Sequence, residues 1–390
     1  MDVAISSPGT LSAMTDPALT ESFTVMPLPP ARGELSAAVI TRLRGEGPDI
    51  GVAQVKSAIA RAGSVLDDDD CQLTLTLLYE LHLRGIGEVP DEMQWAPDLL
   101  AVRSVLEEAM WAEVAALLHS DTVAEAASPR WPARAGAQVD AARRSDIVAE
   151  RIETSARPAS ATVERLWQMT ADDDGPGLSS HIRDDATLAE LREVLIHRSP
   201  YQLREADVHT LGIPRLSGQP KAALIEVQAD EYGGGQLSHM HSVLFAQTMI
   251  AAGLSARYMH YLPRVPAVTL ASLNVLSYFG LHRNRLGELI GHLAAIEMTS
   301  SAPAKRYSAG LARLGFDTGA RKFYDEHIEA DAVHEQIVAR DLVAQWVGED
   351  AARSRQVLDG AAAFLLLEQR IGDHVLSSWM AGRSSLLESP

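Results

Sequence analysis

The stretch Ala320–Val347 reads ARKFYDEHIEADAVHEQIVARDLVAQWV and is the clearest guide to the fold. Its apolar residues recur every three to four positions, which is the period of an α-helix with one face against a core. The same stretch contains the spacing His327-x-x-x-Asp331-x-x-His334. At about 100° per residue, offsets of four and seven residues return to within roughly 40° and 20° of the starting direction. We therefore expect a long helix that carries these three side chains on one face.

The chain on either side of this stretch has the same helical character. No set of alternating apolar and polar strands joined by Asn-Gly or Asp-Gly turns is present. The sequence therefore predicts an all-α protein. Beyond the stretch quoted above, we expect helices over Thr187–Glu205, Lys221–Asp230, Leu237–Ala252, Pro266–Phe279, Arg285–Ser300, Ala302–Leu314 and Ala351–Trp379.

Shifts in composition divide the chain into four parts. We expect a flexible N-terminal tail over residues 1–30, an N-terminal helical region over 31–120 that is a candidate dimerisation element, an Ala/Arg/Pro-rich linker over 121–157 and a main domain over 158–390. Most of the 13 histidines lie in the main domain. In the helical region, the run Asp67–Asp70 lacks the glycine and the distal glutamate of a calcium loop, so we expect it to cap a helix that begins near Cys71.

Charge and cysteine content exclude several classes of function. The 34 basic and 52 acidic side chains give a net charge of −18, which disfavours nucleic acid and anionic membranes as partners. The longest apolar run, near Val265–Leu281, is interrupted by polar residues, so no membrane span is expected. Cys71 is the single cysteine and cannot form an internal disulfide or a cysteine-rich zinc site. No signal peptide is recognised, and we expect a cytoplasmic protein.

A second motif, Glu231-Tyr232-Gly233-Gly234-Gly235, is followed closely by His241. Each glycine costs a helix roughly 1 kcal/mol relative to alanine, so the three together predict an interruption. The interruption would let Glu231 and His241 point at one site from two helical segments. The alternative is an ordinary glycine-rich turn. His239 is the weaker candidate of the two neighbouring histidines.

Imidazole and carboxylate side chains that converge on one helix face form a ligand set for a divalent transition metal. The alternative is a polar face whose histidines contact solvent or the aspartate. A metal site would need ligands from other helices, such as Glu205, which nothing local distinguishes. The paired Glu-x-x-His of ferritin-like proteins, His-Glu-x-x-His, the P-loop, the dinucleotide fingerprint and Gly-x-Ser-x-Gly are all absent.

Taken together, three segments resemble the haem-oxygenase-like di-metal oxidases, also called the iron-containing redox enzyme family. These segments are Tyr201–Asp207, Asp230–Gly235 with His241, and the spacing from His327 to His334. The segments Ile213–Leu216, Glu297–Ser300 and Leu78–His82 are also similar to that family. The resemblance implies a haem-oxygenase-like helical bundle over residues 158–390, with the N-terminal helical region added to it.

The resemblance also implies a metal-ligand set that is at the same time the catalytic set. Its members would come from three core helices: Glu205, then Glu231 and His241, then His327, Asp331 and His334. They would hold two Fe(II) ions, with manganese as a substitute. Dioxygen would be the co-substrate and an external reductant would supply electrons. No haem is implied.

Four further residues are candidates for supporting positions around this set. Glu297 is either an inward-facing or additional ligand, or a structural carboxylate paired with an arginine. Tyr201, Tyr232 and Tyr324 flank the ligand positions and either line a pocket or belong to the core.

The resemblance implies an oxidoreductase that acts on a small molecule. The favoured reaction is N-oxygenation of an amine or amino acid in a biosynthetic pathway. The second is oxidative C–C cleavage, decarboxylation or desaturation of an amino or fatty acid. A third reading, from another class, is a metal-free binding or scaffold protein of the same fold. We expect a homodimer.

Overall fold

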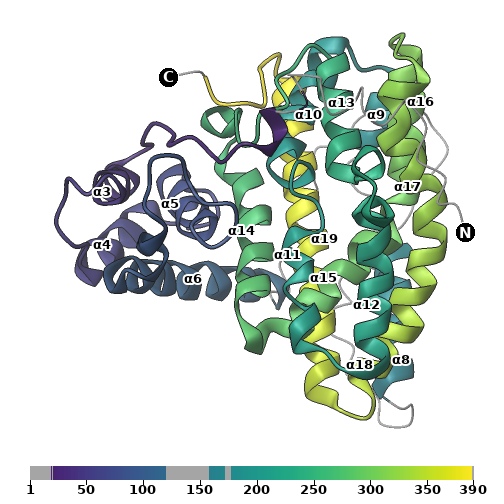
Figure 1. Ribbon diagram of the computed structural model, residues 1–390, viewed down its shortest axis with the longest axis horizontal. Helices are drawn as coiled ribbons and strands as arrows, with labels where there is room; N and C mark the ends of the chain where they lie inside the picture. The colour runs from purple at the N-terminus through teal and green to yellow at the C-terminus, as the bar shows by residue number, and fades with distance from the viewer. Residues whose placement is uncertain (1–18, 20, 120–157, 172–176, 389–390) are drawn as a thin grey trace, which may run out of the picture.

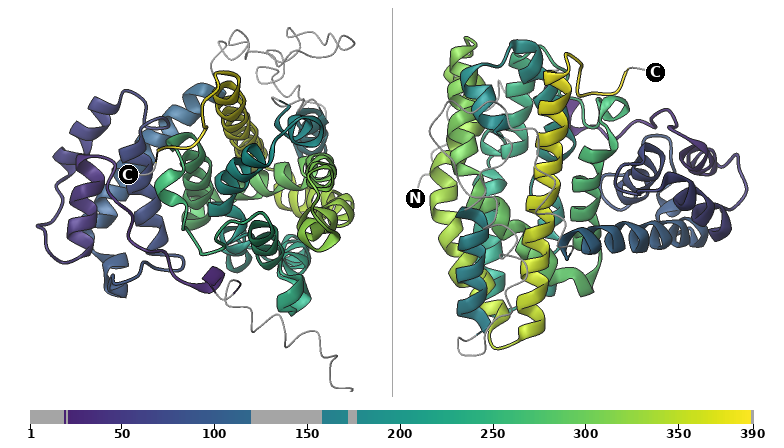
Figure 2. Two further views of the ribbon diagram at one scale, coloured as in Figure 1. Left: turned by 90° about the horizontal axis from the view of Figure 1, so that it is seen from above. Right: turned by 180° about the vertical axis from the view of Figure 1, so that it is seen from behind.

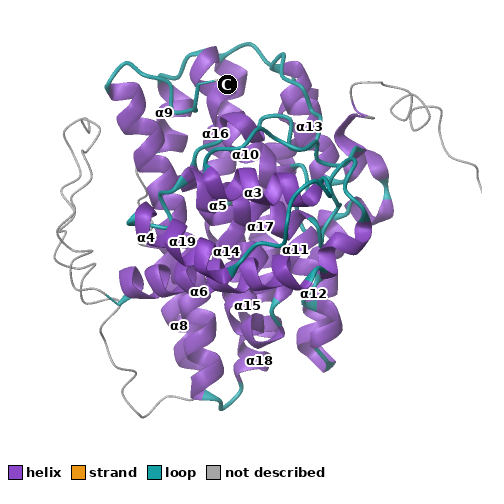
Figure 3. Ribbon diagram, turned by 90° about the vertical axis from the view of Figure 1, so that its left-hand side faces the viewer, coloured by secondary structure: helices purple, strands orange, loops and turns teal. Residues whose placement is uncertain are grey.

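The computed structural model describes residue 19 and residues 21–119, 158–171 and 177–388. Over these residues the protein is helical without any β-strand, apart from one isolated bridge between Met26 and Ile86 (Figure 3). The all-α prediction is therefore confirmed. Residues 1–18 of the predicted tail and all of the predicted linker at 121–157 lie outside the described residues. None of the described helices has the length and apolar character needed to cross a membrane.

The main domain is a bundle of long, roughly parallel and antiparallel helices (Figure 1). The longest, α19 (Ala351–Met380), runs beside α15 (Leu286–Thr299) and α14 (Ala267–Leu281). The remaining long helices are α8 (Pro158–Ala171), α10 (Leu188–Gln202), α12 (Gly218–Glu231), α13 (His241–Ala251), α16 (Ser301–Arg313) and α17 (Thr318–Ile337), and the short ones are α9 (Leu178–Asp184), α11 (Asp207–Thr210) and α18 (Ala344–Val347).

Glycine allows α15 and α19 to approach each other closely. A Cβ atom on Gly291 of α15 would overlap the backbone carbonyl of Val357, and one on Gly360 of α19 would overlap that of Glu288. Larger residues at either position would push the two helices apart. This contact fixes the wall of the bundle against which α14 and α17 pack.

The helix predicted over Ala320–Val347 is present, but its hydrogen bonding changes along its length. It begins as α17, where the Asp317 carboxylate accepts a hydrogen bond from the Ala320 N–H at 2.9 Å. A π-helical segment, η9 (Val338–Val343), then joins it to α18. The sequence does not predict this π-helical segment, which places one extra residue in a turn.

The N-terminal helical region lies against one side of the bundle (Figures 1 and 2). It consists of α3 (Glu34–Leu43), α4 (Val52–Ala62), α5 (Asp69–Glu80) and α6 (Pro97–Leu118), with α5 packed on α14. The predicted cap is confirmed, because the Asp68 carboxylate accepts a hydrogen bond from the Cys71 N–H at 2.7 Å.

A buried ion pair joins the N-terminal region to the bundle. Glu80, at the end of α5, lies 3.2 Å from the guanidinium of Arg204, and the two side chains are 0% and 2% exposed. The Tyr258 hydroxyl donates to the same Glu80 oxygen at 3.0 Å, and Arg204 donates to Ser277 at 3.1 Å. The N-terminal region is thus a packing element of the main domain. Its predicted role in dimerisation stays a prediction.

Breaking this pair should destabilise the protein strongly. In Glu80→Gln the Arg204 charge loses its buried partner, so we expect the free energy of unfolding to fall by about 3 kcal/mol, measured by chemical denaturation. The matched control is Glu34→Gln, which removes an exposed pair with Arg61 and should cost less than about 1 kcal/mol. Equal losses in the two variants would contradict this account of the Glu80–Arg204 pair.

Candidate metal centre

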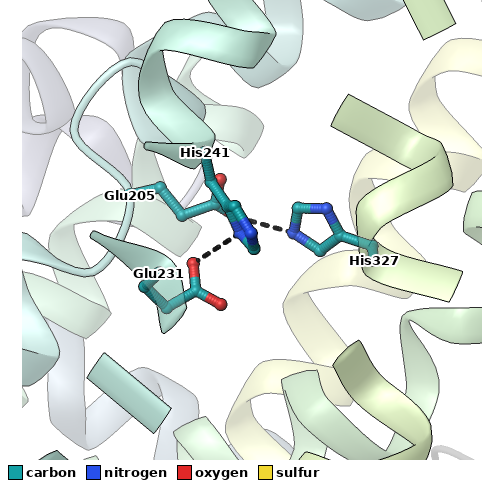
Figure 4. A group of neighbouring side chains, drawn as sticks. All are labelled: Glu205, Glu231, His241 and His327. Atoms are coloured by element: carbon teal, nitrogen blue, oxygen red, sulfur yellow. Dashed lines mark ion pairs between the residues drawn. The ribbon is translucent and has the colours of Figure 1, made fainter. Parts of the chain in front are cut away.

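Ligand-type side chains from four segments converge in the interior of the bundle. Glu205, Glu231, His241 and His327 each offer a ligand atom, and these atoms all lie within 4.8 Å of one another (Figure 4). A second group, Glu231, Glu297 and His334, meets the same limit. Glu231 belongs to both groups, so the two are adjacent. All six residues are buried.

The glycine-rich turn positions the residue shared by the two groups. Glu231 is the last residue of α12 and His241 is the first residue of α13. Between them, Gly233–Gly235 has φ angles of 63°, 59° and 79°, so the predicted interruption is confirmed. At Gly233 the turn is also crowded, since a Cβ atom would lie 2.5 Å from the backbone of His239 and 2.6 Å from that of Met240.

Glu231 and His241 meet in a way that suits a bound cation. Oε2 of Glu231 lies 2.9 Å from Nδ1 of His241, yet the two buried atoms lack the geometry of a hydrogen bond. Buried polar atoms normally have a hydrogen-bonding partner, and among the side chains that the structure describes neither atom of this pair has one. Two ligand atoms that approach without a hydrogen bond can both face a third atom. The arrangement fits a metal ion that both atoms would bind.

The pKa values of the ionisable side chains in this group also favour a bound cation. Burial would raise the pKa of Glu231, but the nearby histidines, His241 first, outweigh burial and lower that pKa to about 2. Burial would lower the pKa of His241, but Glu231 outweighs it and raises that pKa. Burial raises the pKa of Glu205, which has Glu231 as a negative neighbour. Positive charge at the centre would therefore stabilise the ionised carboxylates.

His327 is held in an orientation typical of a metal ligand. Its Nδ1 lies 2.7 Å from the backbone carbonyl oxygen of Phe323, which can only accept, so Nδ1 donates. In a neutral ring Nε2 would then carry the lone pair, and this atom faces Oε1 of Glu205 at 3.6 Å. A hydrogen bond from one ring nitrogen commonly orients the other toward a metal.

His334 lies between two carboxylates. Its Nδ1 is 3.1 Å from Oε2 of Glu297, and its Nε2 is 3.0 Å from Oδ2 of Asp230. Burial would lower the pKa of His334, but Glu297 first and then Asp230 outweigh it and raise the pKa to about 9. Without a metal, the ring is therefore a cation that donates to both carboxylates. Metal binding at the second group must displace a proton from it.

The structure shows which residues surround several of the site residues predicted from the sequence. Glu297 faces His334, so of the two predicted alternatives the inward position is found and the arginine pair is not. Asp230 was not predicted as a contact of His334, although it directly precedes Glu231. The backbone of Asp331 belongs to α17, but its side chain lies outside the described residues.

The three predicted tyrosines differ in position. Burial, followed by the charges of Glu205 and the other glutamates of the centre, raises the pKa of Tyr201, so this phenol lies near the centre. Tyr324 stacks on Tyr307 with ring centroids 5.1 Å apart. The hydroxyl of Tyr232 donates at 3.0 Å to Asp207, the first residue of α11, and among the described residues it has no hydrogen bond to a member of the two groups.

Comparison with known proteins agrees with this geometry. A family model described as iron-containing redox enzyme matches residues 192–369, which confirms the resemblance seen in the sequence. The chain is also 29% identical over 147 residues to 4-chloro-allylglycine synthase from Streptantibioticus cattleyicolor, a match that covers 38% of this chain and 54% of that enzyme. The chain thus spans about half the length of this relative. Together these similarities support an oxidoreductase of the iron-containing redox type.

The glycine turn offers a direct test of how the centre is positioned. Gly233→Ala adds a Cβ atom that collides with backbone, and it must also adopt a positive φ, so we expect the free energy of unfolding to fall by about 3 kcal/mol. Gly234 has a similar φ but open space around it, so Gly234→Ala should cost only about 1 kcal/mol. Chemical denaturation measures both, and equal losses would contradict the close approach of the turn to His239.

Proposed function

We propose that this protein is a non-haem di-iron oxidase that uses dioxygen to oxidise a small, amine-bearing molecule. The observation that carries the proposal is the pair of adjacent, buried ligand groups that share Glu231. One group supplies two carboxylates and two imidazoles, and the other adds Glu297 and His334. The sharing of one carboxylate suits two cations held side by side.

Charge supports two divalent ions over one or none. Two ferrous ions would bring +4, and the carboxylates Glu205, Glu231 and Glu297 bring −3, which leaves a total of about +1. Three buried carboxylates without a cation would be costly, because a buried charge needs a partner. This balance disfavours the metal-free scaffold reading. Oxygen and nitrogen ligands suit iron or manganese.

Bound iron would supply the electron transfer to dioxygen that no side chain in this centre can perform. The residues around the centre hold the metal-ligating side chains in place and exclude bulk water. Phe323 packs edge-on against Phe245 at 5.1 Å between ring centroids and also lies against the ring of His327, so one wall of the centre is apolar. This wall and the Phe323 carbonyl together fix the orientation of His327.

A route for the proton that metal binding displaces is also present. His334 contacts Asp230 through Nε2, and the Asp230 side chain is 61% exposed, whereas His334 is 1% exposed. Asp230 can therefore accept the proton from His334 and pass it to solvent. Glu297, on the other side of the ring, would then face the metal.

The substrate class rests on the comparison as well as on the sequence. The relative named above is a synthase of 4-chloro-allylglycine, an unsaturated amino acid. By similarity we propose an amino acid or a related amine as the substrate. N-oxygenation is the first candidate reaction. The name of the relative favours the second, an oxidation at carbon that cleaves a C–C bond or forms an alkene. The homodimer and the cytoplasmic location stay predictions.

Labelled dioxygen distinguishes the two reactions. N-oxygenation transfers one atom of ¹⁸O₂ to the substrate nitrogen, while the other is reduced to water by two electrons and two protons from the external reductant. The iron-loaded protein should then give a labelled product by mass spectrometry. C–C cleavage to an alkene should give an unlabelled one.

A pair of histidine variants tests the centre in the same assay. His327→Ala should abolish the product, because a ligand is lost. His260→Ala, which alters an exposed histidine, should retain it. Equal product formation by His327→Ala, or by protein without iron, would contradict the proposed function.

A further inference from the structure

One stripe of α10 near the metal centre is half-buried, whereas the residues around it are buried. From residue 194 to residue 206 the chain is buried except at Arg198, Tyr201 and Gln202. These positions are three and four residues apart, so they form one stripe along the helix. Glu205 follows three residues after Gln202, in the turn beyond the end of α10. At 1.5 Å per residue, Arg198 lies about 6 Å along the axis of α10 from its last residue, Gln202.

Arg198 forms an ion pair that the metal centre does not use. Its Nη1 lies 2.5 Å from Oε2 of Glu368 on α19, and the Ser272 hydroxyl donates to the other Glu368 oxygen at 3.4 Å. The Arg198 and Glu368 side chains are 28% and 22% exposed, although both point between helices of the bundle. A pair enclosed by packed protein would be inaccessible. Both side chains of this pair are therefore partly accessible to water.

Two tyrosines connect this ion pair with the centre. Tyr201 is close enough to both Glu205 and Glu368 for each charge to raise its pKa. Burial raises the pKa of Tyr324, nearby Arg198 opposes this rise, and the charge of Glu205 adds to it. The ring of Tyr324 stacks on that of Tyr307, whose pKa is raised by burial and whose neighbour Arg198 opposes that rise. One cation, one anion and aromatic rings thus lie close together beside the centre.

We propose that Arg198 and Glu368 bind the head group of an α-amino acid substrate. The substrate carboxylate would take the guanidinium of Arg198, which recognises carboxylates through two parallel hydrogen bonds. The substrate ammonium would form an ion pair with the carboxylate of Glu368. The substrate side chain would then extend past Tyr201 toward Glu205. This assignment rests on the proposed function, because it takes the metal centre as the place of reaction.

The paired charges select among the substrate classes considered above. A fatty acid would engage Arg198 but separate it from Glu368, leaving that carboxylate without a cation. A simple amine would pair with Glu368 and leave the Arg198 guanidinium without an anion. Only a zwitterion replaces the existing ion pair with two new ones, so both protein charges stay compensated. Because Arg198 lies a full helix turn before the end of α10 and Glu205 lies beyond that end, a long, unbranched side chain is favoured.

Three ligands with related carbon chains test this inference. L-Norleucine has both head groups, hexanoic acid lacks the amine, and pentylamine lacks the carboxylate. We expect L-norleucine to bind the full-length protein at least about 30-fold more tightly than either of the others, measured by calorimetry on metal-free protein and again on manganese-loaded protein under argon. In the manganese-loaded protein, the terminal methyl protons of L-norleucine should relax faster than its α-proton.

Variants show whether the ion pair carries the preference. Arg198→Met and Glu368→Gln should each remove the 30-fold preference, and Arg198→Lys should restore part of it for the carboxylate. The control Arg183→Met removes an exposed arginine and should retain the preference. If Arg198→Met fails to fold, the head-group site is still tested by two results. These are the affinity of Arg198→Lys for the three ligands and the order of their affinities for the unaltered protein.

The possible results separate the two claims. Equal binding of the three ligands, or full preference in a folded Arg198→Met protein, would overturn the head-group site even where two metal ions load. A protein that keeps the ligand ranking but binds no metal would retain the head-group site and overturn the proposed di-iron function.

Discussion

Three glutamate carboxylates, those of Glu205, Glu231 and Glu297, lie together inside a helical bundle where water is largely excluded. Their mutual repulsion and the cost of burying them must be offset by positive charge. In the structure, His241 and His334 offset part of it, and the pKa values of both rings are raised as a result. Divalent cations would offset the rest. The surrounding helices bring these three carboxylates and the two histidines together.

Local features of the chain deliver each group. The glycine turn ends α12 at Glu231 and starts α13 at His241, so two helix termini face each other. At the end of α10, consecutive residues point in different directions, with Arg204 toward Glu80 and Glu205 toward His327. Ala206 follows with a φ of 74°, which is unusual for a residue other than glycine. The N-terminal region therefore supports the backbone beside Glu205 through a buried charge.

The sequence predicts the helices and the glycine interruption, because periodicity and spacing are local. Most of the candidate ligands, and Glu205 above all, follow from the resemblance to a known family. The sequence does not predict which side chains meet across helices. The contact of His334 with Glu297 and Asp230, and the Arg198–Glu368 pair, join residues far apart in the chain. Sequence proximity is also misleading for Tyr232, which follows Glu231 but donates to Asp207. The π-helical segment in the middle of the predicted helix has no local signal.

Anomalous diffraction at the iron edge, from crystals of the protein loaded anaerobically with Fe(II), tests the central claim most directly. The account predicts two iron peaks. One should lie among Glu205, Glu231, His241 and His327, and the other among Glu231, Glu297 and His334, with the Glu231 carboxylate in contact with both. Absence of iron from both groups, or a single ion outside them, would contradict the account.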